Sequence, residues 1–226
     1  MQSPMVEATH QERRVQSYYT WRASNYDAAT GFEAEHHLEA IRRAAIREGQ
    51  HVLEAACGTG RATVDLADAV GASGRVDALD LTDAMLDQAR AKIDQRGFSS
   101  RVHFKQGNAK ALPYPDASFD VLYNGYMFDL IPFEGFLPIL TEFRRVLKPG
   151  GRLVLVNMSK PDSRKTFFER LYERGWAVMP CRPVLMSSYL EPLGFTGVQR
   201  LYRPSRGRIV SKLWGQEIVL ANKAQT

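Results

Sequence analysis

The strongest constraint on the fold of this chain is an alternation of short apolar runs with amphipathic segments, which begins near Gln50. The apolar runs are HVLEAA, VDALDL, VHFKQG, FDVLYNG and RLVLVNM, and helix-like segments such as RATVDLADAV lie between them. Such alternation is typical of a parallel sheet that helices cover on both faces. Two further candidate strands, VQRLYR and EIVLANK, predict an antiparallel pair at the sheet edge. We therefore expect an α/β fold with a seven-stranded, mostly parallel sheet and an antiparallel edge strand.

The segment before the sheet is predicted to be helical. Between residues 11 and 48, aromatic and apolar residues recur at helical spacing, which predicts two or three helices. Its first part contains several large aromatic residues that the sheet does not need for its completion: Tyr18, Tyr19, Trp21, Tyr26 and Phe32. We interpret residues 1–32 as an N-terminal helical lid segment and residues 33–226 as the domain that carries the binding site.

Composition indicates a soluble, cytoplasmic protein. No uninterrupted apolar run approaches the length of a membrane span, and the polar N-terminus lacks the apolar core of a secretory signal. The chain has two cysteines, Cys57 and Cys181, and Cys57 lies in a glycine turn, so we expect no structural disulfide and a reducing compartment. The net charge of +5 is modest and by itself identifies neither nucleic acid nor a membrane as a partner.

The junction between the first predicted strand and its helix reads VLEAACGTG at positions 52–60. Gly58 and Gly60 allow a tight turn there and a close approach of a ligand to the backbone. Asp80 ends the second predicted strand about twenty residues later, where a carboxylate can accept hydrogen bonds from both ribose hydroxyls. Thr63 replaces the small residue of a dinucleotide-binding turn, and Arg61 stands where a P-loop has lysine, so the pattern disfavours a pyrophosphate ligand.

Glu54 places a negative charge at the tip of the first predicted strand. This carboxylate suits a cationic amino group, which it can bind directly or through water. A nucleoside that carries a positively charged amino acid therefore fits the glycine turn, Asp80 and Glu54 together. S-adenosyl-L-methionine is such a molecule, and we expect it as the cofactor. The alternative for Asp80 is the N-cap of the following helix, for which Thr82 or Asp83 is the better candidate.

Across roughly residues 50 to 160 the chain resembles the class I S-adenosylmethionine-dependent methyltransferases, which have a Rossmann-like fold. The resemblance rests on VLEAACGTG, ALDLTDAML, GNAKALPYPDASFDVLYNG and RRVLKPGGRLVLVNMSKP. It implies that the first strand and glycine turn bind the methionine part, Asp80 the ribose, and residues beyond Asp80 the adenine. Asn108 in place of an aspartate and Ala56 in place of a glycine depart from the family pattern. The cofactor-binding residues that we predict are Tyr18, Tyr26, Glu54, Ala56, Gly58, Gly60, Asp80, Leu81, Met85, Asn108, Ala109 and Tyr123.

Within this superfamily, FDVLYNGY and LKPGGRLVLVNMSKP resemble the ubiquinone and menaquinone biosynthesis C-methyltransferases. The resemblance weakens after the fourth strand, where the chain has Met127, Phe128 and Asp129 instead of a Leu-Arg-Asn element. α/β sheets place their chemistry at the carboxyl ends of strands, so we predict Asp129, Tyr126 and Asn124 as catalytic residues. Asp129 is the expected base if the acceptor has a proton to lose, and a helix-capping or surface aspartate is the alternative. The apolar and aromatic residues around it favour a small, partly hydrophobic acceptor: Met127, Phe128, Phe133 and Phe136.

Three classes of function remain open on this evidence. The first is methyl transfer to carbon, oxygen or nitrogen of a small hydrophobic or aromatic metabolite, with a quinone precursor favoured. The second is methylation of a lipid head group or a macromolecule, for which the net positive charge is the support. The third is a catalytically silent module that binds S-adenosylmethionine. We expect a monomer or homodimer that binds no nucleic acid, and contact with a membrane surface stays open.

Two polar clusters have ordinary structural interpretations. His36 and His37 are adjacent and cannot share one helical face, so we expect a solvated or partly packed pair and no metal site. A basic cluster near the C-terminus is interpreted as the solvated face of a hairpin, with an anion-binding surface as the alternative. Its members are Arg200, Arg203, Arg206, Arg208 and Lys212.

Overall fold

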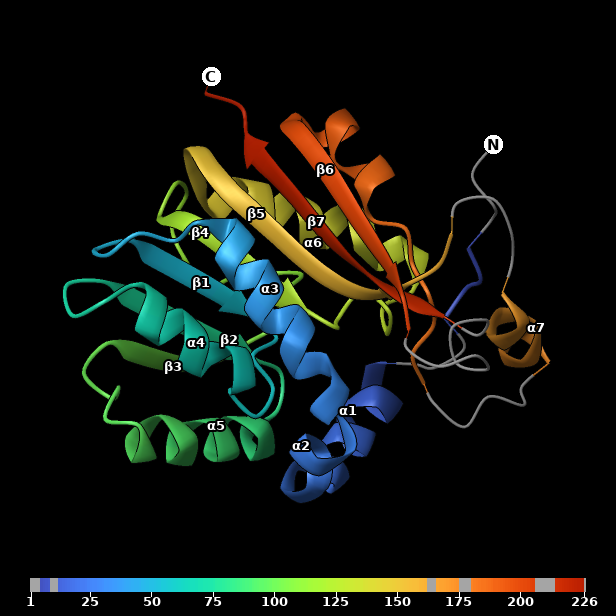
Figure 1. Ribbon diagram of the computed structural model, residues 1–226, viewed down its shortest axis with the longest axis horizontal. Coiled ribbons are helices and arrows are strands. Elements are labelled where there is room, and N and C mark those ends of the chain that lie inside the picture. Colours follow the sequence, from blue (N-terminus) through green and yellow to red (C-terminus); the bar gives the residue numbers. More distant parts are fainter. Residues whose placement is uncertain (1–4, 9–11, 162–165, 175–179, 206–213, 226) are drawn as a thin grey trace.

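The structure of the protein is a computed structural model that describes residues 5–8, 12–161, 166–174, 180–205 and 214–225 of the 226. Its centre is a seven-stranded sheet in the order β3-β2-β1-β4-β5-β7-β6 (Figure 1). The strands are β1 (His51–Ala55), β2 (Arg75–Asp80), β3 (Val102–Gln106), β4 (Phe119–Gly125), β5 (Leu147–Ser159), β6 (Phe195–Pro204) and β7 (Gly215–Lys223). This Rossmann-like α/β arrangement confirms the fold predicted from the strand-helix alternation.

The sheet is parallel from β3 to β5 and antiparallel at one edge. β1 pairs in parallel with β2 and β4, and β4 with β5. β7 runs antiparallel to both β5 and β6, so the antiparallel strand lies one place inside the edge and β6 is outermost. The strand order reverses between β1 and β4, and α/β sheets bind ligands at the carboxyl ends of strands beside such a switch point.

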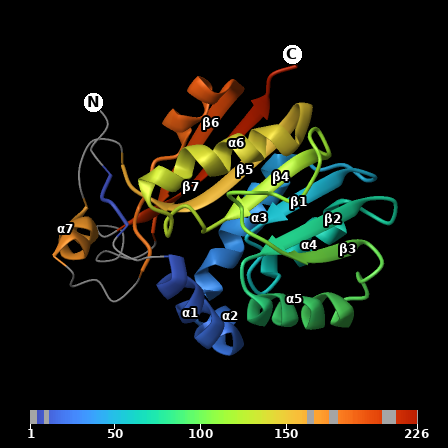
Figure 2. The same ribbon diagram turned by 180° about the vertical axis from the view of Figure 1, so that it is seen from behind.

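Helices cover both faces of the sheet. On one face lie α3 (Ala34–Ala44), α4 (Arg61–Ala69) and α5 (Asp83–Gln95), and α6 (Phe136–Val146) lies on the other (Figures 1 and 2). Neighbouring strand residues point to opposite faces, so that Val52 packs in the cluster under α3 to α5 and Leu53 in the cluster under α6. Both clusters are buried, which explains why these strands read as continuous apolar runs in the sequence.

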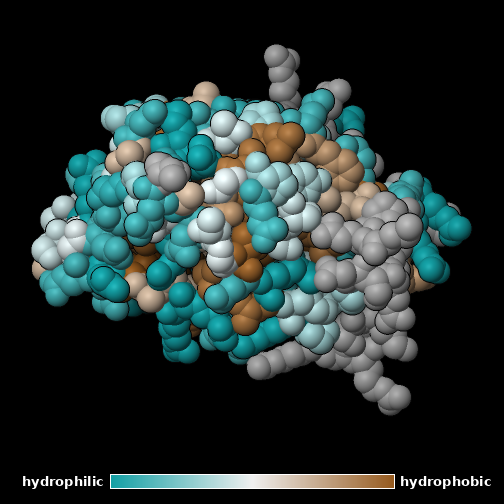
Figure 3. All heavy atoms as spheres, turned by 90° about the horizontal axis from the view of Figure 1, so that it is seen from above, coloured by the Kyte–Doolittle hydropathy of each residue, from teal (hydrophilic) through white to brown (hydrophobic). Residues whose placement is uncertain are grey.

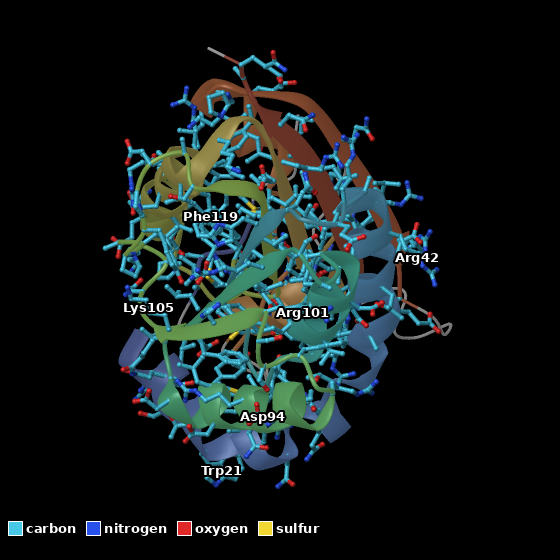
Figure 4. The ribbon with its side chains drawn as sticks, turned by 90° about the vertical axis from the view of Figure 1, so that its left-hand side faces the viewer. Trp21, Arg42, Asp94, Arg101, Lys105 and Phe119 are labelled. Atoms are coloured by element: carbon cyan, nitrogen blue, oxygen red, sulfur yellow. The ribbon has the colours of Figure 1, made fainter. Side chains whose placement is uncertain are left out.

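The N-terminal helices lie beyond the carboxyl ends of β1 and β2. They are α1 (Glu12–Arg22) and α2 (Tyr26–Ala29), and with α3 they make the two or three helices expected before the sheet. The Gln16 side chain on α1 donates a hydrogen bond of 3.5 Å to the Leu81 carbonyl, just past the end of β2. Trp21 projects away from the sheet and is 75% exposed (Figure 4). The N-terminal segment therefore contacts the sheet at the edge where ligands bind in such folds.

The C-terminal part contains buried charges. The helix α7 (Phe167–Glu173) begins with a capping box between Thr166 and Glu169, and Glu169 also forms a fully buried ion pair of 2.6 Å with Lys160. Arg200 does not belong to a solvated face, because it is largely buried against the carboxylate of Glu217 at 2.6 Å. Arg203 is exposed as expected, and the rest of that basic cluster, 206–212, lies outside the described residues.

The described residues were compared with the requirements of a membrane span and of a metal site. On the face seen from above, apolar surface appears in areas bordered by hydrophilic side chains (Figure 3). No described helix combines the length and apolar character that crossing a bilayer requires. The described His, Cys, Asp and Glu side chains also form no group of three or more that could hold a metal ion.

Candidate functional site

A cavity of about 440 Å³ lies at the carboxyl ends of the central strands. Its walls come from the glycine turn after β1, from the β2–α5 junction, and from the segments that follow β3 and β4. Val15, Gln16 and Tyr19 on α1, together with Tyr26, close the cavity on the side away from the sheet. Tyr19 follows Gln16 by three residues and Val15 by four, so Tyr19 is a helical-face neighbour of both. The cavity therefore combines the switch point of the sheet with the N-terminal segment.

The glycine turn after β1 uses left-handed backbone at three positions: Ala56 (φ 59°), Gly58 (φ 53°) and Gly60 (φ 78°). Gly58 lines the cavity, and a β-carbon there would meet no atom within 4 Å. A β-carbon on Gly60 would lie 2.8 Å from the Ala89 β-carbon on α5. Gly60 is not among the described residues that line the cavity, and close packing between α4 and α5 requires a glycine here. This packing does not test the prediction that Gly60 contacts the cofactor.

Asp80 joins the glycine turn to the start of α5. Its Oδ2 accepts a hydrogen bond of 2.8 Å from the Gly58 amide, and its Oδ1 accepts 2.9 Å and 3.1 Å bonds from the Thr82 amide and hydroxyl. Asp80 is 8% exposed and lines the cavity, and burial raises the pKa of its carboxyl group. Thr82 is the N-cap residue of α5, as the sequence suggested, which leaves Asp80 facing the cavity.

The residues predicted for the adenine end also line this cavity. Leu81 and Met85 follow Asp80, and Asn108 and Ala109 come from the segment after β3. The Asn108 Oδ1 accepts a hydrogen bond of 3.0 Å from the Lys110 amide, so this side chain is held by its own loop. An amide oxygen has two lone pairs, and one contact to the Lys110 amide occupies one of them.

A second, smaller cavity of about 50 Å³ adjoins the first. The two share wall residues on both sides of their junction: Tyr26, Ala56, Gly58, Gly125 and Tyr126. Glu54 lines the smaller cavity and is 2% exposed, and its Oε2 accepts a hydrogen bond of 2.5 Å from the Thr63 hydroxyl. Burial raises the pKa of the Glu54 carboxyl to about 8. Thr63, which the sequence marked as a departure from dinucleotide-binding turns, thus orients this carboxyl group.

Sequence reasoning missed two residues of the smaller cavity. Glu33, just before α3, is 8% exposed, and burial raises the pKa of its carboxyl to about 8. His37 is also buried, and its Nδ1 lies 2.6 Å from the Tyr123 hydroxyl. Burial lowers the pKa of His37 to about 3, which keeps the ring neutral near neutral pH. The expectation of a partly packed histidine pair is met, because His37 is buried and His36 is half-buried. Glu33 had no signal in the sequence that marked it as a site residue.

Three further predicted residues are not among the described residues that line either cavity. Tyr123 and Asn124 in β4 are fully buried, because both faces of this central strand are covered. The Tyr123 hydroxyl contacts His37, and the Asn124 Nδ2 donates a 2.8 Å bond to the Ala55 carbonyl. Tyr18 lies on another face of α1 and packs against Tyr19 and neighbouring aromatic rings. Its neighbour Tyr19 lines the large cavity in its place.

The segment after β4 brings one predicted catalytic residue to the cavities. Tyr126 lines both cavities, has a φ of 53°, and its buried hydroxyl has no hydrogen-bond partner among the described residues. Asp129 is 3% exposed and is not among the described residues lining either cavity. Burial raises the pKa of its carboxyl to about 7. Among the aromatic neighbours expected at an acceptor, Phe128 and Phe136 instead belong to the core under α6.

Arg182 holds this segment in place, and the sequence did not mark it. Its side chain is fully buried and donates hydrogen bonds to four main-chain carbonyls, those of Val6, Phe128, Asp129 and Ile131, at 2.6 to 3.1 Å. The guanidinium also lies over the ring of Phe133. Because Val6 belongs to the N-terminus, Arg182 joins that end of the chain to the cavity wall after β4.

Comparison with known sequences identifies the family of this chain. Residues 8–191 match the model of the ubiE/COQ5 methyltransferase family. The chain belongs to this family. A similar curated sequence is the demethylmenaquinone methyltransferase of Lactococcus lactis, 40% identical over 156 residues that cover 66% of this chain and 60% of that protein. The chain spans less than two thirds of the length of the first curated relatives that it matches.

Solved structures of similar proteins share the fold of this family member. The cyclase SpnF superimposes with a TM-score of 0.78 and 19% sequence identity, covering 99% of this chain and 100% of SpnF. A SAM-dependent methyltransferase from Aquifex aeolicus gives a TM-score of 0.65 with 22% identity, covering 90% of this chain and 97% of that chain. One of these proteins is a cyclase, so the shared fold does not determine the reaction. The reaction must be inferred from the residues of the site.

Proposed function

We propose that this chain is an S-adenosylmethionine-dependent methyltransferase that acts on a small, partly hydrophobic or aromatic metabolite. C- or O-methylation of a compound resembling a quinone precursor is favoured, since its Lactococcus relative is a demethylmenaquinone methyltransferase. The observation that carries the proposal is the pair of joined cavities at the switch point. The larger has Asp80 at its nucleoside end, and the smaller has buried carboxyl groups suited to a cation.

The cofactor assignments follow these two cavities. We assign the ribose to Asp80 and the adenine to the walls formed by Leu81, Met85, Asn108 and Ala109. The amino-acid end then enters the smaller cavity beside Glu54, and the sulfur lies at the junction of the two. Ala56, Gly58, Tyr26 and Tyr126 surround that junction. No direct contact is proposed for Tyr18, Gly60 or Tyr123.

The reacting methyl group comes from the sulfonium of the bound cofactor, whose positive charge makes the sulfur a good leaving group. The contribution of the protein is to align the acceptor with that methyl group and to exclude water. Apolar residues after β4 form the wall on which we place the acceptor: Met127, Leu130, Ile131, Pro132 and Ile139. This wall suits a hydrophobic acceptor, because burying apolar surface favours binding.

Asp129 remains the proposed base for an acceptor that must lose a proton. Its carboxyl group is buried behind the cavity wall, and it would receive the proton through a phenol rather than directly. Burial is the main cause that raises the pKa of Tyr19 and Tyr26, and the charge of Asp129 is one of the smaller causes for both. Both phenols are therefore close enough to Asp129 to be influenced by its charge. Both tyrosines line the large cavity, and a relay through either hydroxyl requires a movement on binding, because Asp129 Oδ1 has no hydrogen-bond partner among the described residues. If the acceptor has no proton to lose, Asp129 has no direct chemical role.

The N-terminal segment is proposed to act as a lid. Asp27 connects it to the glycine turn: its carboxylate accepts bonds of 2.5 Å from the Thr59 hydroxyl and 2.6 Å from Lys92, and its carbonyl accepts one of 2.7 Å from Arg61. With Gln16 near Leu81, these contacts span both ends of the cavity. Hydrogen exchange with and without S-adenosylhomocysteine tests the lid, since residues 11–32 should gain protection comparable to that of 53–60. Unchanged exchange at 11–32 beside a protected glycine turn would reduce the segment to ordinary packing.

Incubation with S-adenosylmethionine labelled on the methyl group and a metabolite extract tests the proposed reaction. We expect a labelled small molecule and S-adenosylhomocysteine, with both formed much more slowly by Asp80→Ala. A label that appears only in lipid or macromolecules would favour the second function class, especially if binding weakens with salt. Binding of the cofactor without transfer to any fraction would indicate a silent module.

A further inference from the structure

The smaller cavity contains two buried carboxyl groups from distant parts of the chain. Glu54 comes from β1 in the sheet, and Glu33 comes from the N-terminal side, directly before α3. Both line the same space of about 50 Å³, and both are more than nine-tenths buried. Two carboxyl groups facing one small cavity are costly in a folded protein unless they are protonated or a cation lies between them.

The two carboxyl groups differ in their hydrogen-bond partners. Glu54 accepts a hydrogen bond from the Thr63 hydroxyl. The Glu33 carboxyl has no hydrogen bond or ion pair with any residue that the structure describes, although it is 8% exposed and faces the cavity. The Glu33 oxygens are not among the fully buried atoms that lack a partner, so they reach the cavity and are open to a ligand there. A cationic donor fits this group, because it would hold the carboxyl in its ionised form, which only accepts hydrogen bonds.

The other charges of this cavity restrict the chemistry of the partner. Arg61 also lines it, and its guanidinium is suited to bind a carboxylate. His37, the remaining basic side chain among the described walls, stays neutral because burial lowers its pKa to about 3. A cation subsite formed by two glutamates next to one arginine fits a zwitterionic α-amino acid group, with its ammonium between the glutamates and its carboxylate toward Arg61.

We propose that Glu33 is a second ammonium-binding residue of this site, so that Glu33 and Glu54 together bind the amino group of the cofactor's amino-acid end. This inference rests on the proposed function. It assigns to Glu33 a positioning role that connects the ligand to the N-terminal side of the site, because Glu33 follows directly on the proposed lid. Binding of the ammonium group then draws the segment before α3 against β1.

A link between binding and protons follows from the same arrangement. Without ligand, burial raises the pKa of both carboxyls to about 8, so both are largely protonated at neutral pH. A bound ammonium favours the ionised forms and lowers these pKa values, and binding therefore releases protons. Affinity should rise with pH up to about 8, where the free carboxyls are already ionised.

Neighbouring charges modulate this link and do not reverse it. Asp129 and Asp27 raise the pKa of Glu33, after the larger effect of burial, and Arg61 lowers it. The charges around Glu54 act after burial and the Thr63 hydrogen bond: Asp80 and Asp65 raise its pKa, and Lys92 lowers it. The phenols of Tyr26 and Tyr126, which also line the cavity, keep their protons because burial raises their pKa. The carboxyl groups of the two glutamates are therefore the groups expected to titrate on binding.

Calorimetry with two nucleosides tests this inference. S-adenosylhomocysteine carries the amino-acid group, and 5′-methylthioadenosine has the same adenosine and thioether without it. We expect the affinity for S-adenosylhomocysteine to rise as pH increases from about 6 to 8, with proton release measured in buffers of different ionisation enthalpy. The affinity for methylthioadenosine should not change over this range.

The Glu33→Gln variant isolates the proposed residue. It should bind S-adenosylhomocysteine about ten- to a hundredfold more weakly and release fewer protons, while its methylthioadenosine affinity stays at the wild-type value. That unchanged affinity also shows that the variant is folded. Glu35→Gln, which changes an exposed glutamate in the first turn of α3, is the matched control and should behave as wild type.

Two results overturn the inference, and they differ from a failure of the proposed function. Equal weakening of both nucleosides by Glu33→Gln, or wild-type proton release in that variant, would show that Glu33 does not bind the ammonium group. In either case the wild-type protein still binds S-adenosylhomocysteine, so the proposed function stands. Failure of the wild-type protein to bind either nucleoside would overturn the proposed function and this inference together.

Discussion

Replacing Asp80 with alanine should weaken nucleoside binding more than any other single change at the large cavity. The carboxylate of Asp80 faces the cavity while its oxygens hold the Gly58 amide and the Thr82 amide and hydroxyl. Asp80→Ala therefore removes the proposed ribose acceptor and also loosens the turn. The two effects act in the same direction on binding, so a control must separate them.

The hydrogen bonds that Asp80 already makes give the expected size. Among the described residues, Oδ1 accepts from the Thr82 amide and hydroxyl, and Oδ2 accepts from the Gly58 amide. One lone pair on Oδ2 is open to a ribose hydroxyl, and a second acceptor position opens when the Thr82 hydroxyl turns away. A hydrogen bond to a charged group contributes about 1.5–3 kcal/mol, so loss of one strong or two weaker bonds costs about 3 kcal/mol, or about 150-fold in affinity.

Isothermal titration with S-adenosylhomocysteine measures this loss. Thr82→Val is the control for the turn, because it keeps the carboxylate, frees one of its lone pairs, and removes no N-cap hydrogen bond from α5. It should bind as wild type does. Asp129→Ala removes a buried carboxyl outside the described cavity walls and should cost much less than Asp80→Ala. Equal losses in the Asp80 and Asp129 variants, or an Asp80→Ala affinity within about threefold of wild type, would refute the ribose assignment.

Four further substitutions test other parts of the structure. Gly60→Ala should lower the free energy of unfolding by about 2–4 kcal/mol, because the added β-carbon meets Ala89 and the backbone at this position is left-handed. Gly58→Ala should lower it by only about 1–2 kcal/mol and should mainly weaken the binding of S-adenosylhomocysteine. Urea unfolding and calorimetry distinguish these outcomes, and reversed effects would contradict the packing described for the turn. Arg182→Ala should lose roughly 3–5 kcal/mol and roughly 6–20 °C in Tm by leaving buried carbonyls unpaired, and a loss below about 1 kcal/mol would contradict that role. The raised pKa of Glu54 means that its contribution to ligand-free stability is lost as pH rises from its ordinary value of 4.5 through about 8. Glu54→Gln should therefore gain Tm relative to wild type as pH rises from about 5 to 8, and parallel Tm curves would contradict the burial of Glu54.

The sheet was predictable from the sequence because its physical cause is local. Strands buried on both faces must be apolar throughout, and the helices between them must be amphipathic, so the pattern identifies both. The glycine turn and Asp80 were predictable for a similar reason. A strand tip followed by glycines, with an acid at the next strand tip, is a short-range pattern whose two parts the parallel pairing of β1 and β2 brings together.

Other site features depend on packing that no short pattern records. Tyr123 and Asn124 lie near the end of β4, but both are fully buried because both faces of the sheet are packed against other elements. The sequence does not show at which residue the strand passes from this buried region to the cavity. Glu33 becomes a cavity residue because the segment before α3 packs over the glycine turn. Arg182 acts on carbonyls more than fifty residues away in the chain. Only Thr63 carried a usable signal, since a hydroxyl one helical turn after the glycines can reach a strand-tip acid.

Competitive calorimetry with the wild-type protein tests the central claim most directly. The claim is that the joined cavities bind a nucleoside with a cationic amino-acid end and reject a pyrophosphate. We predict that S-adenosylmethionine and S-adenosylhomocysteine bind at one site per chain, while NADH and ATP at millimolar concentration neither bind nor displace them. Binding of NADH or ATP together with no detectable binding of either S-adenosyl compound would contradict the assignments of Glu54, Thr63 and Asp80, and with them the proposed function.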